Sequence, residues 1–530
     1  MFNIAVIEGI KSKSISHQVG QTLLETLRGA DIKIRTGCQE MGACGLCTVF
    51  IRNGISSPIT ATEELQLGHR LSLGMRLACQ VIPQGDLVVE LISQGNKVLA
   101  NTQSDETQLK YPSERTSHTH GCGSGYGIAV DIGTTNVSIA VFNWENGRQL
   151  ATLTFSNPQH EYGTDVITRM LKAAEDVSVA KDLQKKVIHK INENIQKLVH
   201  GMGISMEEIA DVGVVGNTAM LALFHGDGYQ KLLDPQYWGK TLLFQKADIK
   251  AITEIFHLRQ DTSITIVDPL AGFVGSDLLA GITGIRMLDK EAGTLFLDFG
   301  TNTEIALWDG NLVWVTAASG GPAFEGCGMS CGSAAIPGAI FQAHSSSNAE
   351  IPFATLTIEG RDATGICGSG YVDIIGTLLT MDLLDSIGRF SGKMKSDQEI
   401  VIMESPLIKI TKKDIDGFQR AKAAVAAGIR ILLLRAGMFS VDISQVYITG
   451  NFGKFLDVTN AQHIGLLPSI DSGKICICEN AVLQGCREIM LYGEAKEMLG
   501  KIREKANYIN LAYDSEFESA FMESLFLKPY

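Results

Sequence analysis

The sequence lacks any apolar run of about 18 uncharged residues, the length needed to cross a lipid bilayer. Its N-terminal residues also lack the basic and long apolar regions of a secretory signal. Positive charge is scarce: 45 Lys and Arg residues stand against 58 Asp and Glu, for a net charge of −13. Sequence-independent nucleic-acid binding needs many cations to neutralise phosphates. We therefore expect a cytoplasmic protein with neither a membrane nor a nucleic-acid partner.

Two common nucleotide-binding motifs are missing as well. No G-x-G-x-x-G occurs, and the Gly-Lys-Thr at 239–241 has Asp234 where a P-loop has its first glycine. These absences exclude the Rossmann and P-loop folds. The chain is nevertheless rich in glycine, with 55 in 530 residues, and the glycines cluster in short loops that indicate phosphate or cluster chemistry. A chain of this length predicts three or four domains of about 150 residues each.

The eleven cysteines are an odd number in a chain without a secretory signal, which favours metal ligation over disulfides. Cys38, Cys44 and Cys47 follow the spacing C-x5-C-x2-C, and Cys79 comes later. Three thiolates in one glycine-rich loop plus a distant fourth are typical of a [2Fe–2S] cluster. A four-cysteine zinc site is the alternative, but it usually shows two C-x2-C knuckles. We therefore predict a [2Fe–2S] cluster on these four cysteines.

The segments around the cysteines predict a small β-grasp frame. Residues 3–8, 47–54 and 86–92 alternate as strands, and residues 21–30 have helical spacing with a glycine near the end. With its cysteines, this region, residues 1–93, resembles [2Fe–2S] ferredoxins. The first gap of five residues resembles the adrenodoxin-like branch more than the plant type.

A polar stretch follows at residues 94–126. It is rich in Ser, Thr, Asn and Gln, which predicts a flexible tether. A coil of about thirty residues spans roughly 30 Å, enough for a small domain to move between two docking places. His118, His120 and Cys122 could be metal ligands, but three such residues in a polar linker are more often incidental.

A strand–Asp–turn–strand pattern then appears twice, at residues 127–142 and 294–308. The aligned pairs are Asp131 with Asp298, Gly133 with Gly300, and Thr134 with Thr301. An internal repeat reports architecture, so we predict two related halves that each open with a hairpin.

The residue types of this repeat indicate phosphate chemistry. Gly-Thr turns present consecutive backbone N–H groups that bind phosphate oxygens, and an Asp at a strand end can hold Mg²⁺ directly or through its waters. Two such hairpins facing each other would hold a polyphosphate from both sides. The alternative is two ordinary hairpins, and the recurrence of Asp, Gly and Thr argues against it.

More glycine-rich turns follow at 214–220, 318–326, 365–375 and 445–455, of which the first and last are predicted to join a strand to a helix. Together with the repeat, they resemble the ASKHA superfamily of acetate and sugar kinases, Hsp70 and actin. The resemblance implies an α+β multi-domain chain: the ferredoxin domain, then two RNase H-like ATPase lobes over 127–285 and 286–530. It further implies that ATP binds at Gly133, Thr134, Thr135, Asn217, Thr218, Gly300, Thr301, Asn302, Gly320, Gly321, Gly450 and Gly453, the last two forming the adenosine motif.

The combination of modules, with the blocks 157–170, 321–326, 365–370 and 464–468, resembles the reductive activators of corrinoid-dependent proteins. The likeness covers nearly the whole chain. It implies ATP-dependent transfer of one electron from the cluster to Co(II), regenerating Co(I) for methyl transfer. The implied partners are a corrinoid protein of a methyltransferase system and an electron donor that the sequence does not name. Activators of this kind often dimerise, so a homodimer is a further expectation.

In the mechanism that this resemblance implies, the catalytic residues are Asp131, Asp298 and a carboxylate that orients the attacking water. Asp131 and Asp298 would place Mg²⁺. The sequence leaves three candidates for the third role: Glu304, Glu325 and Asp277.

Two other functions are weighed against this one. An ATP-gated electron donor to a dehydratase or reductase would need a bridging [4Fe–4S] cluster, for which Cys327, Cys331 and Cys367 are available. We favour the interpretation that these three cysteines are small buried thiols rather than cluster ligands. A metabolite kinase with a regulatory cluster would need no protein partner.

Overall fold

A computed structural model of the chain describes residues 2–8, 11–30, 32, 34, 47–67, 71, 74–91, 125–163, 165–242, 244, 249–320, 323–324, 329–333, 335–346, 353–391 and 399–530. Several predictions fall outside these residues: those on Cys38, Cys44, His118, His120, Cys122, Gly321, Glu325 and Cys327, and most of the predicted linker. Within the described part of the chain, no helix combines the length and apolar character needed to cross a membrane.

The N-terminal domain is a five-stranded mixed sheet with the order β2-β1-β5-β3-β4. Its elements are β1 (Phe2–Glu8), β2 (Lys11–His17), α1 (Leu23–Gly29), β3 (Thr48–Ser56), α2 (Ala61–Leu67), β4 (Met75–Leu77) and β5 (Pro83–Leu91). β1 and β5 are parallel, and the other neighbours are antiparallel. Alternate residues of β1, Ile4 and Val6, are buried against Leu23 and Leu24 of α1, and a capping box of Thr22 and Glu25 begins that helix. This is the predicted β-grasp frame.

The first lobe of the larger module is built on a sheet with the order β10-β9-β6-β7-β8. Its strands are β6 (Tyr126–Ile132), β7 (Asn136–Asn143), β8 (Gln149–Ser156), β9 (Ile209–Gly216) and β10 (Ser263–Ile266). β6, β7 and β8 form an antiparallel meander, and β9 and β10 continue the sheet in parallel. One face packs against α3 (Val166–Glu175), α4 (Val177–Gly201), α5 (Thr218–His225), α6 (Tyr229–Leu232) and α7 (Ile249–Ile255).

The second lobe repeats this topology and adds one strand, giving the order β20-β19-β11-β12-β13-β21. Its strands are β11 (Thr294–Phe299), β12 (Thr303–Trp308), β13 (Val313–Ala318), β19 (Gln445–Thr449), β20 (Ile475–Ile477) and β21 (Ala506–Tyr508). Its helices are α9 (Gly368–Thr380), α10 (Lys412–Ala436), α11 (Gly450–Gly453), α12 (Val458–His463), α14 (Gly493–Lys505) and α15 (Phe517–Ser524). Two small sheets complete it: β14 (Ala339–Ser345) with β15 (Phe353–Thr357) and β16 (Gly365–Ile366), and β17 (Glu399–Met403) with β18 (Ile408–Thr411).

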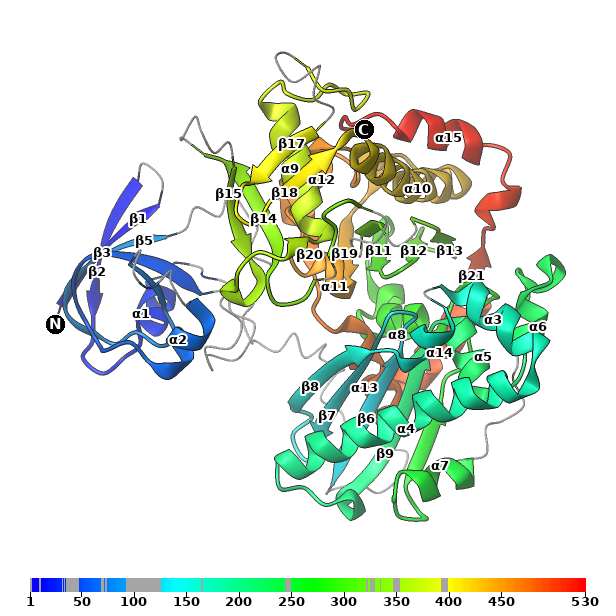
Figure 1. The fold of residues 1–530 in the computed structure, drawn as a ribbon. Coiled ribbons are helices and arrows are strands. Elements are labelled where there is room, and N and C mark those ends of the chain that lie inside the picture. Colours follow the sequence, from blue (N-terminus) through cyan, green and yellow to red (C-terminus); the bar gives the residue numbers. More distant parts are fainter. Residues whose placement is uncertain are drawn as a thin grey trace.

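Two helices lie between the lobes and exchange partners (Figure 1). α8 (Ser276–Gly284) follows the first sheet but packs on the inner face of the second. α13 (Ala481–Leu491) follows the second sheet and packs on the first. They cross where a Cβ on Gly485 would overlap the Ala280 carbonyl, so only glycine permits this approach. The exchange makes the two lobes one packed unit, with the strand ends of both sheets facing a shared interior.

Candidate functional site

At the cluster end of the chain, Cys47 and Cys79 lie side by side. Their sulfur atoms are 3.3 Å apart, and both residues are buried. Thiolates bound about 2.3 Å from one tetrahedral metal are separated by roughly 3.8 Å. The observed separation is within about half an ångström of that value, so a small side-chain adjustment makes the two cysteines ligands of one iron, although 32 residues separate them in sequence. Cys38 and Cys44, the other two predicted ligands, are outside the described residues.

A buried ion pair positions the distant cysteine. Arg76 in β4 donates from Nε and Nη2 to the two carboxylate oxygens of Glu63, each at 2.8 Å. The same carboxylate accepts the Leu77 backbone N–H at 3.0 Å. Burial alone would raise the pKa of Glu63, but the hydrogen bonds from Arg76, Thr60 and Leu77 hold it below its usual value. The pair fixes β4 against α2 and thereby the turn that presents Cys79. Sequence reasoning missed it, because Arg76, although only three residues before Cys79, is 13 residues from Glu63 and no sequence pattern links the two.

The two predicted phosphate turns meet at the centre of the ATPase. The hydroxyl oxygens of Thr135, after β6, and Thr301, after β11, are 3.1 Å apart. They are 166 residues apart in sequence, so the lobes bring the two halves of the repeat face to face. Gly133 donates its N–H to the Asn136 carbonyl at 3.0 Å, and Gly300 donates to that of Asn302 at 2.9 Å. Both turns are therefore closed by a glycine N–H.

Four carboxylates gather behind these turns: Asp131, Asp277, Asp298 and Glu304. Asp131 lies near the end of β6 and Asp298 in β11, while Asp277 lies in the first turn of α8. Glu304 in β12 is the cross-strand partner of Asp298. Asp277 and Glu304 are buried, and the Oδ1 atom of Asp131 is buried without a hydrogen-bond partner.

Burial raises the pKa of all four carboxyl groups, and repulsion by neighbouring acids adds to this effect for Asp131, Asp298 and Glu304. Burial raises the pKa of Asp277 to about 6. Burial, with the charge of Asp277, raises the pKa of Asp298 to about 7. The pKa values of Asp131 and Glu304 are shifted well above the usual range by burial and then by the neighbouring acids. Like charges held together in this way repel unless a cation joins them.

Within the described residues, no ion pair reaches any of the four acids. In the same part of the chain, no three acidic, His or Cys side chains converge closely enough to hold a metal by themselves. This arrangement suits a hydrated divalent cation, which takes one or two carboxylates and completes its shell with waters and phosphate oxygens. The unpartnered Oδ1 of Asp131 is the clearest vacant acceptor for such a cation or its waters.

Asn157 and Arg169 hold the first turn from behind. Asn157 donates its side-chain N–H to the Gly133 carbonyl at 2.9 Å, and its backbone N–H to the Thr135 carbonyl at 2.8 Å. Arg169, almost fully buried, donates to the Thr134 carbonyl at 2.8 Å and the Gly163 carbonyl at 2.7 Å. The residue types of Asn157 and Arg169 alone predict no role for them. The one signal that could have identified them is their position in the block 157–170, which resembles the family.

Asn217 and Thr218 follow β9, as predicted, and begin α5. The Asn217 side chain accepts the Ala219 N–H at 3.0 Å and so caps the helix. The Thr218 hydroxyl is buried and donates to the Ala271 carbonyl at 2.9 Å. Both side chains therefore contribute to the fold beside the first turn, and nucleotide binding by either stays a prediction.

Gly450 follows β19 and brings the end of that strand into contact with the second turn. Its φ is +89°, and a Cβ there would overlap the Phe299 carbonyl and lie 3.0 Å from Oδ1 of Asp298. The sequence predicts a helix after Gly450 and Gly453, but α11 begins at Gly450 and contains both. The helix starts as soon as the strand ends because Gly450 can adopt the left-handed conformation at that junction. Gly320 lies beside the Phe324 ring, in a loop of the same lobe.

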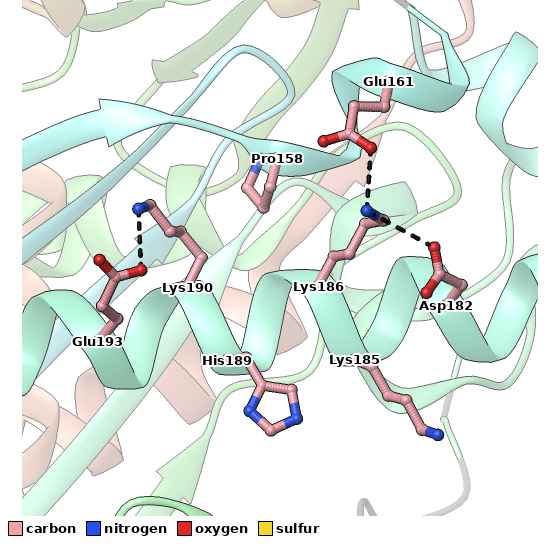
Figure 2. Close-up of a pocket in the computed structure, with 8 residues that line it drawn as sticks. All are labelled: Pro158, Glu161, Asp182, Lys185, Lys186, His189, Lys190 and Glu193. Carbon is pink, nitrogen blue, oxygen red and sulfur yellow. Dashed lines mark hydrogen bonds and ion pairs between the residues drawn. The ribbon is translucent and has the colours of Figure 1, made fainter.

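A separate surface hollow of about 440 Å³ lies along the outer face of α4 (Figure 2). Two of its three lysines are paired: Lys186 with Glu161 at 2.9 Å, and Lys190 with Glu193 at 2.9 Å. Because most of its charges are paired and none of the predicted site residues line it, the hollow is not a candidate active site.

Together, the fold and these sites define a class: a [2Fe–2S] ferredoxin domain joined to a two-lobed ASKHA-type nucleotide-binding protein. Comparison with known proteins agrees. The family model described as the C-terminal domain of RACo, the ASKHA domain, matches residues 292–530. The RACo middle region matches 126–290, and a 2Fe-2S iron-sulfur cluster binding domain matches 7–84. The chain belongs to the RACo family, which confirms the predicted family and the predicted fold class.

The relatives carry related names. The corrinoid activation enzyme RamQ of Eubacterium limosum is 30% identical over 423 residues, which cover 75% of this chain and 69% of RamQ. A reductase of Methanosarcina barkeri, specific for the Co(II) methylated amine-specific corrinoid protein, is 25% identical and covers 75% of this chain and 76% of its own length. A solved reductive activator for a corrinoid, iron–sulfur protein superposes with a TM-score of 0.68 at 26% identity, covering 99% of this chain and 98% of that chain.

Proposed function

We propose that this protein is an ATP-dependent reductive activator of a corrinoid protein. It passes one electron from its [2Fe–2S] cluster to the Co(II) of the partner and so restores Co(I), the nucleophile for methyl transfer. One observation carries the proposal: a single chain of this family holds two sites together. The first is a buried thiol pair suited to an iron, and the second is an acidic site at which the two predicted phosphate turns meet. The names of the relatives support the corrinoid protein as the electron acceptor.

Energetics explain why an ATPase belongs with the cluster. Plant-type [2Fe–2S] centres have potentials near about −400 mV, and corrinoid Co(II) with its lower axial ligand is harder to reduce. Transfer is then uphill. A nucleotide can shift such an equilibrium only through different affinities for two states. We infer that ATP favours a docked state in which the corrinoid has lost that axial ligand, so that cobalt accepts the electron.

In this proposal the nucleotide lies between the two turns. Gly133, Thr134 and Thr135 face the phosphates from the first lobe, and Gly300, Thr301 and Asn302 from the second. Asn217, Thr218, Gly320, Gly321, Gly450 and Gly453 complete the predicted nucleotide contacts, with Gly450 and Gly453 on the adenosine side. Mg²⁺, when bound, neutralises the phosphate charge. Asp131 and Asp298 hold it or its waters.

Glu304 is the group we assign to the attacking water. It is buried and pairs across the sheet with Asp298, and burial first and then the acids around it raise its pKa. When deprotonated, a carboxylate with a raised pKa is a stronger base than an ordinary one. Asp277 is less suited, because its Oδ1 accepts the Leu278 N–H at 2.8 Å and its own helix turn therefore holds it.

Cys38, Cys44, Cys47 and Cys79 are the proposed cluster ligands. The cluster, when bound, accepts and releases one electron at a time. We place the ferredoxin domain at residues 1–93, the tether at 94–126 and the ATPase lobes at 127–285 and 286–530. The polar composition of the tether suits movement of the cluster between an electron donor and the corrinoid partner. Association of two chains stays a prediction.

The test is anaerobic visible spectroscopy of a Co(II) corrinoid protein mixed with the reduced chain. We expect the Co(I) spectrum to appear only when ATP and Mg²⁺ are both present, and a non-hydrolysable analogue gives the matched control. Co(I) formed equally fast without nucleotide would overturn the proposal. A dehydratase or a small hydroxy compound as the preferred acceptor would favour the alternative functions instead.

A further inference from the structure

Two cysteines outside the cluster and the nucleotide site lie together in the second lobe. Cys476 is in β20 and Cys478 follows it, and their sulfur atoms are 3.7 Å apart. Residues i and i+2 of a strand point to the same face, with Cα atoms about 6.6 Å apart. That separation is inside the range that disulfides tolerate. Both side chains are partly exposed, so a small reactant in solution can reach them. In contrast, Cys486 on the neighbouring helix is buried.

We propose that Cys476 and Cys478 are a thiol–disulfide site, which forms a reversible intramolecular disulfide with low-molecular-weight disulfides and thereby changes the nucleotide site. The proximity of the two thiols, their shared face and their exposure carry the assignment. The proposal has two parts. The effect of the disulfide on nucleotide binding rests on the proposed nucleotide site between the lobes, whereas formation of the disulfide does not depend on that site.

The surroundings of the pair favour Cys476 as the attacking thiol. The hydrogen bond between the two thiols, and then the charge of Lys290, lower the pKa of Cys476 to about 7 against the effect of burial. The same hydrogen bond raises the pKa of Cys478, and burial adds to this effect. The Lys290 ammonium lies 5.5 Å from the centre of the Tyr447 ring, and Tyr447 is the cross-strand partner of Cys476. A thiol with a pKa near ambient pH attacks disulfides best.

The exchange balances with a disulfide such as oxidised glutathione as the oxidant. The Cys476 thiolate attacks one sulfur of the oxidant, and one glutathione thiolate leaves. The Cys478 thiol then loses its proton and attacks the Cys476 sulfur, and the second glutathione thiolate leaves. Two cysteine thiols are oxidised to one disulfide, while one glutathione disulfide is reduced to two thiols, which take up the two protons.

The position of the pair connects it to the nucleotide site. Cys478 donates its backbone N–H to the Ile448 carbonyl at 2.7 Å, and β19 continues from Ile448 through Thr449 into Gly450, which abuts Asp298. α13 begins at Ala481, three residues after Cys478, and crosses to the first lobe. Disulfide Cα atoms most often lie about 5.5–6 Å apart, so closing the bond from a strand separation of about 6.6 Å pulls on this segment. We therefore expect the oxidised form to bind nucleotide more weakly.

The first measurement maps the disulfide in the full-length protein with its cluster loaded, under anaerobic conditions. Oxidised glutathione is the probe, free thiols are then alkylated under denaturing conditions, and the chain is cleaved after Lys, Arg and Glu. Residues 475–479 then carry Cys476 and Cys478 on one peptide, and residues 480–487 carry Cys486 on the next. We expect the first peptide to lose two hydrogens and resist alkylation, with reversal by dithiothreitol, while Cys486 is recovered fully alkylated and without glutathione.

Two single variants, Cys476→Ser and Cys478→Ser, are the matched controls. Each is expected to leave a lone thiol that is alkylated or carries one glutathione. Alkylation of both cysteines in the wild-type peptide after oxidation, or one glutathione on each, would overturn the site. The cluster absorption recorded in parallel shows that oxidation has not acted through the cluster cysteines.

The second measurement is nucleotide affinity before and after oxidation. We expect at least a threefold weaker affinity for Mg-ATP in the oxidised wild type, restored by dithiothreitol, and no change in Cys478→Ser. Equal affinity in both redox states would overturn the coupling while leaving the disulfide itself demonstrated. A reduced chain that binds no nucleotide at all would contradict the proposed function, and the peptide masses would still decide the disulfide.

Discussion

The two hairpins that open the ATPase lobes have the same plan but different detail. In the first, the cross-strand partner of Asp131 is Ser138, whereas in the second the partner of Asp298 is Glu304. The stretch joining the paired residues is one residue longer in the first hairpin, as the register shows. The first turn is held from behind by hydrogen bonds of Asn157 and Arg169. The second turn rests against the backbone of Gly450.

This difference shows how a duplicated unit can divide one task. Both halves kept the aspartate and the Gly-Thr turn, which are what phosphate and cation binding require. The second half alone added a buried glutamate beside its aspartate, and we assign water activation to that residue. The first half instead gained a fixed support for its turn. We propose that the first turn is the firmer phosphate cradle and that the second is the reactive side.

The largest expected effect comes from the residues that both hairpins share. Asp131→Asn and Asp298→Asn should each lower the ATP hydrolysis rate by about 100-fold or more, because each removes a carboxylate that holds the cation. Steady-state hydrolysis measured on protein with an unchanged cluster spectrum checks this. Full activity in either variant would mean that one hairpin alone binds the cation and that the shared site is wrong.

The second effect tests the asymmetry directly. Glu304→Gln should lower kcat by about 100-fold, the lower range for loss of a general base, with little change in KM. The matched variant Ser138→Ala, at the equivalent position of the first hairpin, should stay within about twofold of the wild type. Similar losses in the two variants would contradict the assignment of Glu304.

The third effect concerns the support of the first turn. Arg169→Met leaves the buried Thr134 carbonyl and the part-buried Gly163 carbonyl without this donor, and an unsatisfied buried group costs about 1–3 kcal/mol. We expect a lower thermal unfolding midpoint and roughly tenfold weaker nucleotide binding. Lys172→Met on the exposed face of the same helix is the control, with an expected change within about 0.5 kcal/mol. Wild-type affinity in Arg169→Met would show that the turn does not depend on this anchor.

The fourth effect tests the corresponding contact in the second lobe. Gly450→Ala combines a left-handed φ of +89° with overlap of the Phe299 carbonyl. Gly437→Ala has a similar strain, at φ +66°, but no atom near the added methyl group. Left-handed backbone costs about 1 kcal/mol in both, so any further loss of stability or nucleotide affinity in Gly450→Ala reports the overlap. Equal behaviour of the two variants would remove the proposed role of this contact.

The smallest effect is the pH dependence of the ligand-free protein. The folded-state pKa values of Asp277 and Asp298, about 6 and about 7, lie above those of an unfolded chain. The folded state therefore binds more protons between about pH 4 and 7, and its stability falls as the pH rises through that window. Asp298→Asn should unfold at a higher temperature than the wild type at pH 8, and this difference in unfolding temperature should become smaller towards pH 5.5. A gap that is constant with pH would contradict the raised pKa of Asp298.

Much of this architecture could be predicted because its signals are local. The alternation of apolar residues indicated strands such as β1 and β5, and the repeated Asp-Gly-Thr pattern indicated two hairpins whose threonines do meet in the structure. Each signal depends on residues close in sequence or on an exact repeat. The family resemblance extended that reading to the whole chain, and the family matches confirm it.

The remainder depends on tertiary packing, which the sequence pattern does not encode. Arg169 serves a turn 35 residues earlier, and nothing in its own helix marks it. The sequence also did not reveal that the two hairpins differ in register. An ungapped alignment of the repeats matches Glu304 with Val137, whereas in the structure Ser138 holds the position equivalent to Glu304. The exchange of α8 and α13 between the lobes likewise depends on distant glycines such as Gly485.

The central claim, that nucleotide at the shared site drives the electron from the cluster to cobalt, is tested most directly with Asp298→Asn. Cobalt reduction is followed anaerobically with a Co(II) corrinoid protein, the variant carrying a reduced cluster, and Mg-ATP. We predict a cluster spectrum identical to that of the wild type and no Co(I) above the level seen without ATP. Co(I) formation at the wild-type rate would contradict the claim.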